Sequence, residues 1–483
     1  MRSVLPLCLG GLLTLTGCAT QPTSPTAPAQ GLAPEPWSAT DGLTRATPLP
    51  AHWWRLYQDP LLDALVARTL EHNPDLASAE AHVQGLLGSL RAASGERLPD
   101  ARLGYAYRYG RDGDDQTLAQ ARGESVEDTG KHALSLDLSY ELDFWGRVAA
   151  SIRAARDEAE AARAARDGLR TTLVAQTARA YASACALGEQ EAVTRRAVAL
   201  VQQGLVLTER QVAAGALDEL DRARQQALLE NTAAPLSAIQ ARRRVALLAL
   251  QQLSGEAPGP VAAELANCSR VPQLAKALPV GDGWALLQRR ADVREAERRL
   301  AASGERVQVA HADLYPQVRL GLGIESAAVT PSGLGDGEAL TYAVGPLISW
   351  RWPNQEQARG QLQRAQAGEA EAQAHFHSVS LAALHEVERD LALYAGSYGQ
   401  RQRLAAAERA AQQAWHLAQV SYDAGAVDGF ERLDSERSLV GAQQRLAEAD
   451  LELVQRQVAV FQALGGGWQD ENETAPTART GER

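Results

Sequence analysis

Two pairs of short segments alternate between apolar and polar residues, one pair in each half of the chain. Leucine or tyrosine takes every second position over residues 103–109 and 134–142, and apolar side chains alternate similarly over residues 318–325 and 340–350. Because successive side chains of a strand point to opposite faces, each segment predicts a β-strand with one apolar and one polar face. Strands of about ten residues with this alternation are typical of transmembrane barrels, although a soluble hairpin packed on a core has the same pattern.

Four strands are too few to enclose a channel. About eight strands are the practical minimum for a barrel made by one chain, and open strand edges are not tolerated in lipid. If these strands lie in a membrane, the chain must therefore oligomerise, and three copies would supply twelve strands. Beyond the N-terminal segment, no stretch approaches the roughly 20 continuous apolar residues that a spanning helix needs.

A long helical run follows the second strand of each half. Residues 147–213 and about 355–423 contain no proline, and at about 1.5 Å per residue each run predicts a rod of roughly 100 Å. Alanine recurs along the rods, which permits close packing of helices, whereas the sustained leucine or isoleucine heptads of a two-stranded coiled coil are missing. The pattern therefore favours long packed helices over a simple coiled coil.

Each rod is predicted to end at a glycine turn. Gly215 and Gly425 lie at equivalent places in the two halves and supply the left-handed conformation that ends a helix. Asp218 and Asp428 follow three residues later and are predicted to cap the returning helices.

The connecting segments complete the pattern. Asp59-Pro60 predicts the start of a helix that runs to about Arg97 before the strands begin. The polar residues 110–131 between the first two strands predict a loop, and a shorter glycine-rich loop at residues 326–338 separates the second pair.

The N-terminus predicts an export signal. Arg2 supplies a positive charge, residues 5–15 form an apolar core, and the segment ends in Leu15-Thr16-Gly17-Cys18. This tetrapeptide resembles the lipobox of bacterial lipoproteins, which implies a diacylglycerol and an N-acyl chain on Cys18. Ala19 stands where retention in the inner membrane usually requires aspartate, so the resemblance favours the outer membrane. The alternative is an ordinary cleaved signal with an incidental cysteine.

The same order of helix, strand pair, rod and returning helix in both halves indicates an internal duplication. We predict a division into a signal peptide at residues 1–17, a lipidated tether at 18–50, a first repeat at 51–255, a linker at 256–282, a second repeat at 283–468 and a disordered tail at 469–483.

The net charge, the cysteines and the missing catalytic motifs limit the classes of function that the sequence supports. The net charge of −11 leaves no basic stripe for nucleic acid. Cys185 and Cys268 remain after the two N-terminal cysteines, and an oxidising periplasm permits one disulfide between them; two separate buried thiols are the alternative. The sequence shows no nucleophile–base pair and no metal-ligand spacing. His375 and His377, near Glu386, point apart on a helix, so we expect neither an enzyme nor a metal site.

Several motifs point to one family. They are Trp53-Trp54, Asp59-Pro60, Asn73-Pro74-Asp75-Leu76, the turn from Tyr422 to Gly425 with Leu433-Asp434 beyond it, and, most specific, Tyr140-Glu141-Leu142-Asp143-Phe144-Trp145-Gly146-Arg147 at a junction of strand and rod. The chain resembles the outer-membrane factor family, the TolC/OprM-like efflux ducts, and especially its lipoprotein branch. Trp352-Pro353-Asn354-Gln355 at the second junction departs from the Phe-Asp-Gly-Gly-like string of the family.

The resemblance implies an α+β membrane protein that works as a homotrimer. Its fold would be a twelve-stranded β-barrel in the outer-membrane lipid, with four strands per chain, continuous with a twelve-helix α-barrel in the periplasm. The linker would lie in an equatorial belt around the α-barrel. The tips at Gly215, Asp218, Gly425 and Asp428 would meet a periplasmic adaptor attached to an inner-membrane pump.

The resemblance also implies a gate at the second tip. It assigns the constriction to Asp434, with Phe430 one turn earlier, and it makes Tyr422 a candidate for a tip hydrogen bond that breaks on opening. Three copies of Asp434 around one axis would form an acidic ring that binds cations. A solvated helical carboxylate is the plain alternative for Asp434, and core packing is the plain alternative for Phe430.

The function expected from the whole sequence is a gated, passive outer-membrane duct of a tripartite efflux system for drugs or toxic small molecules. A duct for type I protein secretion is the alternative within the same class. From another class, a periplasmic coiled-coil scaffold lipoprotein without a pore would share the helices, and the four alternating strands argue against it.

Overall fold

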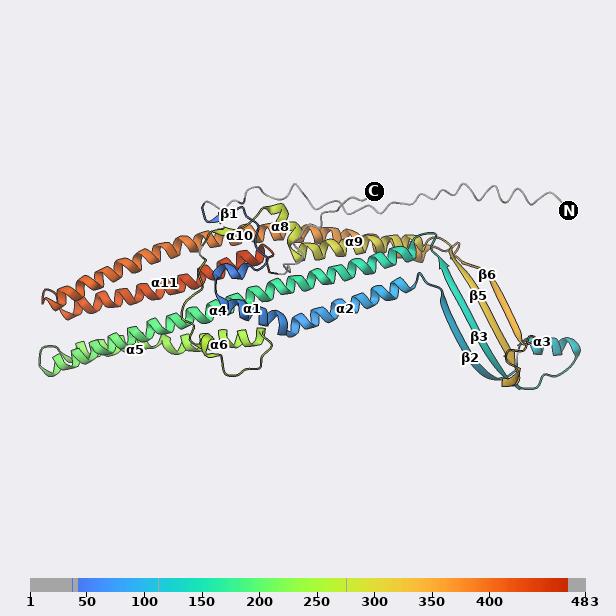
Figure 1. The fold of residues 1–483 in the computed structure, drawn as a ribbon, viewed down its shortest axis with the longest axis horizontal. Helices are drawn as coiled ribbons and strands as arrows, with labels where there is room; N and C mark the ends of the chain where they lie inside the picture. The colour runs from blue at the N-terminus through green and yellow to red at the C-terminus, as the bar shows by residue number, and fades with distance from the viewer. Residues whose placement is uncertain (1–36, 38–41, 112, 275, 468–483) are drawn as a thin grey trace. The chain divides into compact units, whose positions relative to one another are not determined.

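The computed structural model describes residues 37, 42–111, 113–274 and 276–467. The predicted signal peptide, Cys18, most of the tether and the predicted tail lie outside the described residues. The chain forms two compact units, each drawn from both sequence repeats (Figure 1). The strand unit contains Leu87–Glu158 and Arg298–Ala374, and the helical unit contains the other described residues.

The strand unit holds one antiparallel sheet with strand order β2-β3-β5-β6 (Figure 1). Its elements are β2 (Asp100–Gly110), α3 (Gly113–Arg122), β3 (Thr129–Leu142), β5 (Gln317–Ala328), the short 3-10 helix η2 (Pro331–Gly333) and β6 (Leu340–Ser349). All four predicted strands are therefore present, and the strands of the two repeats are joined by the pairing of β3 with β5.

The register of the sheet keeps apolar residues together on one face. Leu136 of β3 lies opposite Leu103 of β2 and Ile324 of β5, and Ile324 lies opposite Tyr342 of β6. A shift of one residue would move every one of these side chains to the other face. The alternation in the sequence and the observed register therefore agree.

Helices α2 (Pro74–Gly95), α4 (Arg147–Ala213), α9 (Ala291–Ala312) and α10 (Glu356–Asp423) have residues in both units. The two predicted rods correspond to α4, with 67 residues, and α10, with 68 residues. Each is one unbroken helix, as the absence of proline predicts.

The predicted single helix from residue 60 to about residue 97 is wrong. It is divided into α1 (Pro60–His72) and α2 by Asn73, whose ψ of 124° is extended. Proline at position 74 disfavours the helical conformation of the residue before it. The Asn73 side chain then caps α2 by accepting hydrogen bonds from the backbone N–H groups of Asp75 at 3.0 Å and Leu76 at 3.1 Å.

The predicted loop at residues 110–131 is also partly wrong, because it contains the exposed helix α3. Its Gln-Thr-Leu-Ala-Gln-Ala-Arg run is rich in good helix formers, which the polar composition concealed.

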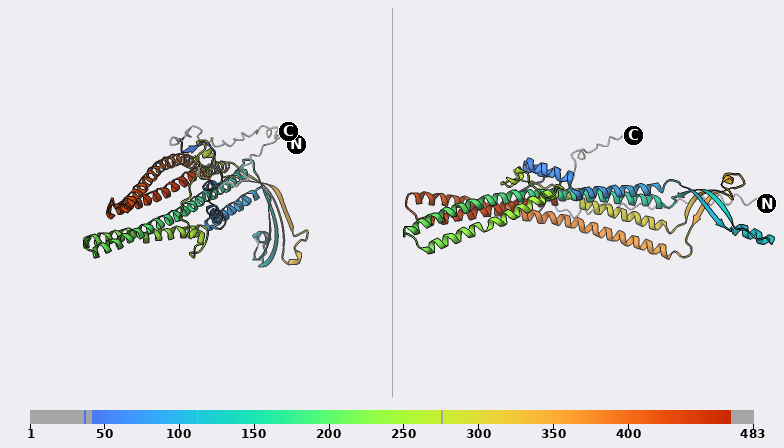
Figure 2. Two further views of the ribbon diagram at one scale, coloured as in Figure 1. Left: turned by 60° about the vertical axis from the view of Figure 1, so that its left-hand side comes forward. Right: turned by 90° about the horizontal axis from the view of Figure 1, so that it is seen from below.

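The helical unit contains two long hairpins whose turns lie at one end of the unit (Figure 2). One joins α4 to α5 (Glu219–Ala233) and α6 (Pro235–Leu253), and the other joins α10 to α11 (Gly429–Ala463). The smaller elements are β1 (Thr44–Arg45), η1 (Trp53–Tyr57), α1, α7 (Ala263–Ala266), β4 (Leu278–Pro279) and α8 (Gly283–Arg289), with β1 parallel to β4.

Aromatic residues from the two ends of the chain form the centre of the helical unit's core. Trp53 is fully buried and stacks on Phe461 with 4.7 Å between ring centroids. Tyr57 donates a hydrogen bond from its hydroxyl to Oε1 of Gln457 at 3.1 Å. This contact between residues 400 positions apart ties the short helix η1 to α11.

Two arginines cover the C-terminal end of α11. Arg290 Nη1 donates to the carbonyl oxygen of Ala463 at 2.7 Å, and Arg289 Nε donates to that of Leu464 at 3.2 Å. These carbonyls have no partner inside the helix, and a cation there also interacts favourably with the helix dipole. Among the described residues, no helix is both long enough and apolar enough to cross a membrane.

Candidate channel-forming site

The apolar face of the sheet is open to solvent in the single chain. Leu103 is 75% exposed, Tyr342 is 76% exposed and Val344 is 69% exposed. An exposed apolar surface of this extent in a folded unit marks a face that is covered by lipid or another apolar surface. The sheet also has two open edges, since within the described residues β2 pairs only with β3 and β6 only with β5.

The opposite face of the sheet carries small and polar residues. Gly104 lies opposite Ser135, Ser135 lies opposite Glu325, and Asp137 lies opposite Gly323. These residues line a shallow hollow of about 510 Å³. The absence of large side chains at these positions leaves room along the polar face, as a face that lines a water-filled passage requires.

Aromatic side chains lie near both ends of the strands. Tyr107 packs against His132 with 4.8 Å between ring centroids near the far end of β2 and β3. Near the helices, Trp145 stacks on Tyr315 at 4.7 Å and donates from Nε1 to the carbonyl oxygen of Pro316 at 2.7 Å. Amphipathic rings at both margins of an apolar band are typical of a barrel surface at two membrane–water interfaces.

The most specific sequence motif forms the junction of β3 and α4. Arg147 makes a two-pronged ion pair with Glu141, with Nε···Oε1 at 2.8 Å and Nη2···Oε2 at 3.0 Å. The Asp143 carboxylate accepts hydrogen bonds from the N–H groups of Val148 and Ala149, at 3.1 and 2.8 Å, and so caps α4. The motif therefore fixes the change from strand to helix.

The first hairpin tip lies between α4 and α5. Gly215 has φ of 72°, and the Asp218 carboxylate caps α5 by accepting a hydrogen bond from Asp221 N at 3.0 Å. Glu219 forms an ion pair with Arg222 at 2.7 Å. The charged residues at this tip are thus paired with one another.

The second tip has the same backbone design. Gly425 has φ of 73°, and the Asp428 carboxylate accepts a hydrogen bond from Glu431 N at 2.9 Å. Phe430 is 77% exposed and Asp434 is exposed, so neither side chain is used for packing within the chain. The Tyr422 ring lies at the same tip.

Leu433, next to Asp434, packs against the first hairpin. A Cβ atom at Gly204 of α4 would lie 3.2 Å from Cδ2 of Leu433. Gly204 therefore leaves the space that the leucine fills, and this contact sets the position of α11 against α4 close to the second tip.

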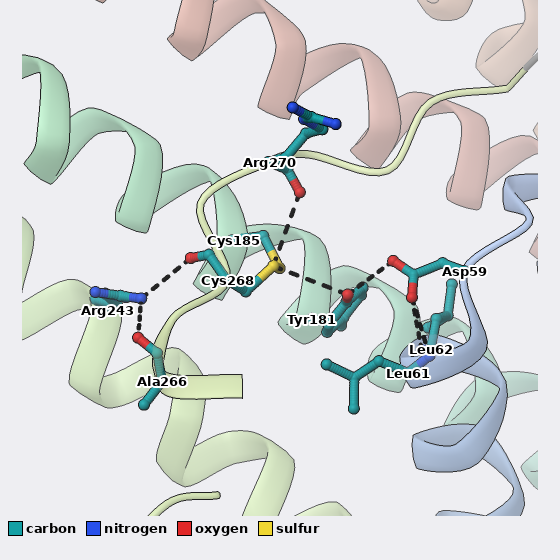
Figure 3. The surroundings of a disulfide bond; sticks show 9 residues. All are labelled: Asp59, Leu61, Leu62, Tyr181, Cys185, Arg243, Ala266, Cys268 and Arg270. Carbon is teal, nitrogen blue, oxygen red and sulfur yellow. Dashed lines mark hydrogen bonds between the residues drawn. A yellow bond between two sulfur atoms is a disulfide. The ribbon is translucent and has the colours of Figure 1, made fainter. Parts of the chain in front are cut away.

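Cys185 and Cys268 form a disulfide with 4.7 Å between their Cα atoms (Figure 3). From the sequence, this disulfide and two separate buried thiols were both possible. Tyr181 Oη lies 3.8 Å from Sγ of Cys268 and donates to Oδ2 of Asp59 at 2.7 Å, and Asp59 caps α1. Burial and the Asp59 carboxylate raise the pKa of Tyr181, so its hydroxyl stays protonated.

The linker crosses α4 beside this disulfide. Arg243 of α6 donates from Nη2 to the carbonyl oxygens of Ala266 and Cys268 (Figure 3). Its Nη1 lies 3.1 Å from Glu191 Oε2 of α4. The carbonyl of Cys268 lies so close to Gly188 that no Cβ fits there. The linker is therefore fixed at a glycine, which neither the spacing of the cysteines nor the helical pattern predicted.

The histidines considered as metal ligands are not assembled into a site. Glu386 pairs with Arg290 at 2.7 Å. Within the described part of the chain, no group of three or more His, Cys, Asp and Glu side chains is arranged to hold a metal ion.

The combination of an exposed apolar strand face, a polar face of small residues and long helical hairpins defines a subunit of an outer-membrane channel. The sequence profile described as "Outer membrane efflux protein" matches residues 65–256 and 285–466. The chain belongs to this family.

Individual relatives cover almost the whole chain. The pyoverdine export outer membrane protein OpmQ of Pseudomonas putida is 32% identical over 97% of this chain and 98% of its own length. The cation efflux system protein CusC of Escherichia coli O157:H7 is 26% identical over 96% of this chain and 99% of its own length.

Solved structures of outer-membrane channels have a similar fold. The outer-membrane channel OprN superposes with a TM-score of 0.83 at 30% identity, covering 92% of this chain and 98% of that one. The outer membrane protein VceC of Vibrio cholerae superposes with a TM-score of 0.77 at 27% identity, covering 87% of this chain and 100% of that one. The expected fold class, that of the trimeric outer-membrane efflux channels, is confirmed, and the protein is an outer-membrane channel of an efflux system.

Proposed function

We propose that three copies of this chain form one gated, passive duct with no catalytic step. The observation that carries the proposal is the four-stranded sheet with an exposed apolar face and two open edges. Closure requires β6 of one copy to pair with β2 of the next, and three sheets give the twelve strands of a closed barrel. The apolar face then contacts outer-membrane lipid and the polar face lines the passage.

We propose a lipid anchor at Cys18 and partner proteins at the hairpin tips. Cys18 carries a diacylglycerol and an N-acyl chain, and several chains on one residue hold a protein stably in a membrane. A relative, SilC of Salmonella typhimurium, is described as a probable outer membrane lipoprotein. The tips around Gly215, Asp218, Gly425 and Asp428 meet a periplasmic adaptor, which connects the duct to an inner-membrane pump that supplies the energy.

We place the gate at Asp434, Phe430 and Tyr422. Phe430 and Asp434 are exposed in the single chain, although an apolar ring on a solvated helix is costly unless another surface covers it. In a trimer the three Asp434 carboxylates form a ring that attracts cations, and the three Phe430 rings narrow the passage beside it.

Small molecules or ions are the proposed cargo. The named cargoes of the relatives are pyoverdine for OpmQ, cations for CusC and toluene for TtgF of Pseudomonas putida. Cargoes this different in chemistry support a duct whose selectivity for drugs or toxic compounds resides in the pump.

Current through planar bilayers tests the duct directly. The purified full-length protein is expected to give small, cation-preferring conductance steps, because the gate rests closed and is acidic. A protein that inserts into the bilayer and never conducts would be a scaffold, and this result would contradict the proposed function.

Labelling of two neighbouring positions in β6 is the matched control. Ala343 lies on the polar face and Val344 on the apolar face. In proteoliposomes, Ala343→Cys is expected to react with a membrane-impermeant thiol reagent, whereas Val344→Cys is expected to stay unlabelled. The reverse pattern would contradict the assignment of the two faces.

A further inference from the structure

Arg432 of α11 reaches across the second hairpin to α10. Its guanidinium carbon lies 5.0 Å from the centroid of the Tyr422 ring, and its Nη1 donates to Oε1 of Gln419 at 3.3 Å. At this distance the electron-rich face of an aromatic ring attracts a cation. One side chain therefore joins the two helices directly beneath the turn at Gly425.

The contact is made to the ring of Tyr422 and not to its hydroxyl. Within the described residues, the hydroxyl of Tyr422 has no hydrogen-bond partner. The Nε atom of Arg432 is buried and likewise has no partner. The hold of Arg432 on α10 thus depends on the Tyr422 ring face and on Gln419.

Arg432 has a second partner within reach on its own helix. Glu436 lies one turn further along α11, at a spacing that brings an arginine and a glutamate side by side. Glu436 is buried, forms no ion pair with a described residue, and burial raises the pKa of its carboxyl group while Arg432 lowers it. The Arg432 side chain is turned toward Tyr422 and Gln419 of α10, although the Glu436 carboxylate lies on its own helix, α11.

The orientation of Arg432 affects the proposed gate, because Arg432 lies between Phe430 and Asp434 in the sequence. Arg432 is turned to the Tyr422 ring, and among the described residues no Lys, Arg or His side chain forms an ion pair with Asp434 or Glu431. On the other side, the adjacent Leu433 packs at Gly204 of α4. The gate segment is therefore held from α10 by Arg432 and from α4 by Leu433.

We propose that Arg432 is a positioning residue of the gate: its contact with the Tyr422 ring and Gln419 holds the second hairpin tip in the resting state, and Glu436 is its partner when the tip opens. This inference rests on the proposed function. A side chain with two alternative partners on different helices is a two-position element of the kind that gating requires.

Resting conductance of four variants in planar bilayers tests this assignment. Arg432→Met keeps the length and removes the charge, and it is expected to raise resting conductance severalfold. Tyr422→Leu removes the ring and is expected to do the same, whereas Tyr422→Phe keeps the ring and is expected to stay closed. Arg432→Lys keeps a cation and is expected to restore most of the closure.

Two further measurements separate a gating role from a packing role. The double variant Arg432→Met/Tyr422→Leu is expected to conduct no more than either single variant, because both remove one interaction. Glu436→Gln removes the competing carboxylate and is expected to lower channel opening, the opposite of Arg432→Met. A general loosening of the hairpin would raise conductance in all these variants.

The outcomes are distinct from those for the proposed function. If the wild-type protein does not conduct, the duct itself is wrong. If the wild-type protein conducts and both Arg432→Met and Tyr422→Leu leave its resting conductance unchanged, the positioning role of Arg432 is overturned. An open Tyr422→Phe channel would assign closure to the hydroxyl and would also overturn it.

Discussion

Replacement of Asp434 by alanine is expected to raise the resting conductance of the channel severalfold and to abolish its block by divalent cations. At the proposed gate, three carboxylates around one axis would concentrate cations in the narrowest part of the passage, and the bound cations would hold the ring together. Alanine removes both the charge and part of the side chain that narrows the pore. The measurement is single-channel recording with and without added divalent cation.

Arg224 provides the matched control at the first tip. It occupies the position 210 residues before Asp434 in the duplicated chain, and it pairs with Asp221 at 3.6 Å. Arg224→Ala is expected to leave resting conductance and cation block unchanged. Equal effects of the two substitutions, or an Asp434→Ala channel that stays closed and blocked, would contradict the gate assignment.

Replacement of Gly188 by alanine is expected to destabilise the protein by about 3 kcal/mol, at the upper end of the cost of overpacking. The added Cβ would meet the carbonyl oxygen of Cys268 closer than 3.0 Å, and the Arg243 guanidinium also lies nearby. The linker cannot move away freely, because its disulfide is attached to α4 one turn earlier, at Cys185. The expected result is a lower midpoint of heat denaturation in detergent.

Gly168 lies on the same helix and is the control for this substitution. A Cβ there would lie 3.5 Å from the Cβ of Ala291, an ordinary contact. Gly168→Ala is expected to be neutral or to stabilise the helix by about 0.5–1 kcal/mol. A Gly188→Ala protein as stable as the Gly168→Ala protein would show that the linker does not need the glycine.

The regular elements could be predicted because their signals are periodic and local. The alternation around Leu136 and Ile324 specified both the strands and the face that each residue occupies. The absence of proline between Arg147 and Ala213, followed by the turn at Gly215, specified the length of α4. Such patterns depend on the backbone repeat alone and need no knowledge of tertiary contacts.

The errors and omissions have a different physical origin. The break at Asn73 depends on the conformational restriction imposed by Pro74, which the apolar spacing on either side concealed. The roles of Gly188 and Arg432 depend on contacts with residues on other elements. A single sequence contains no periodic signal for such contacts, so the duct was predictable from the sequence and the residues that hold its linker and tip were not.

Three copies of the sheet are expected to close into one barrel, and cross-linking between the open edges of neighbouring copies measures this closure. Ala106 of β2 and Ala343 of β6 lie on the polar face at opposite edges of one sheet. Three strand spacings separate the two edges within a chain, roughly 14 Å. A bifunctional thiol reagent shorter than this span can join Ala106→Cys to Ala343→Cys only between neighbouring copies.

The membrane-embedded double variant is expected to give a covalent trimer on a denaturing gel, while each single variant is expected to stay monomeric. A double variant that yields only monomers, or a ladder that continues beyond three copies, would contradict a closed twelve-stranded barrel.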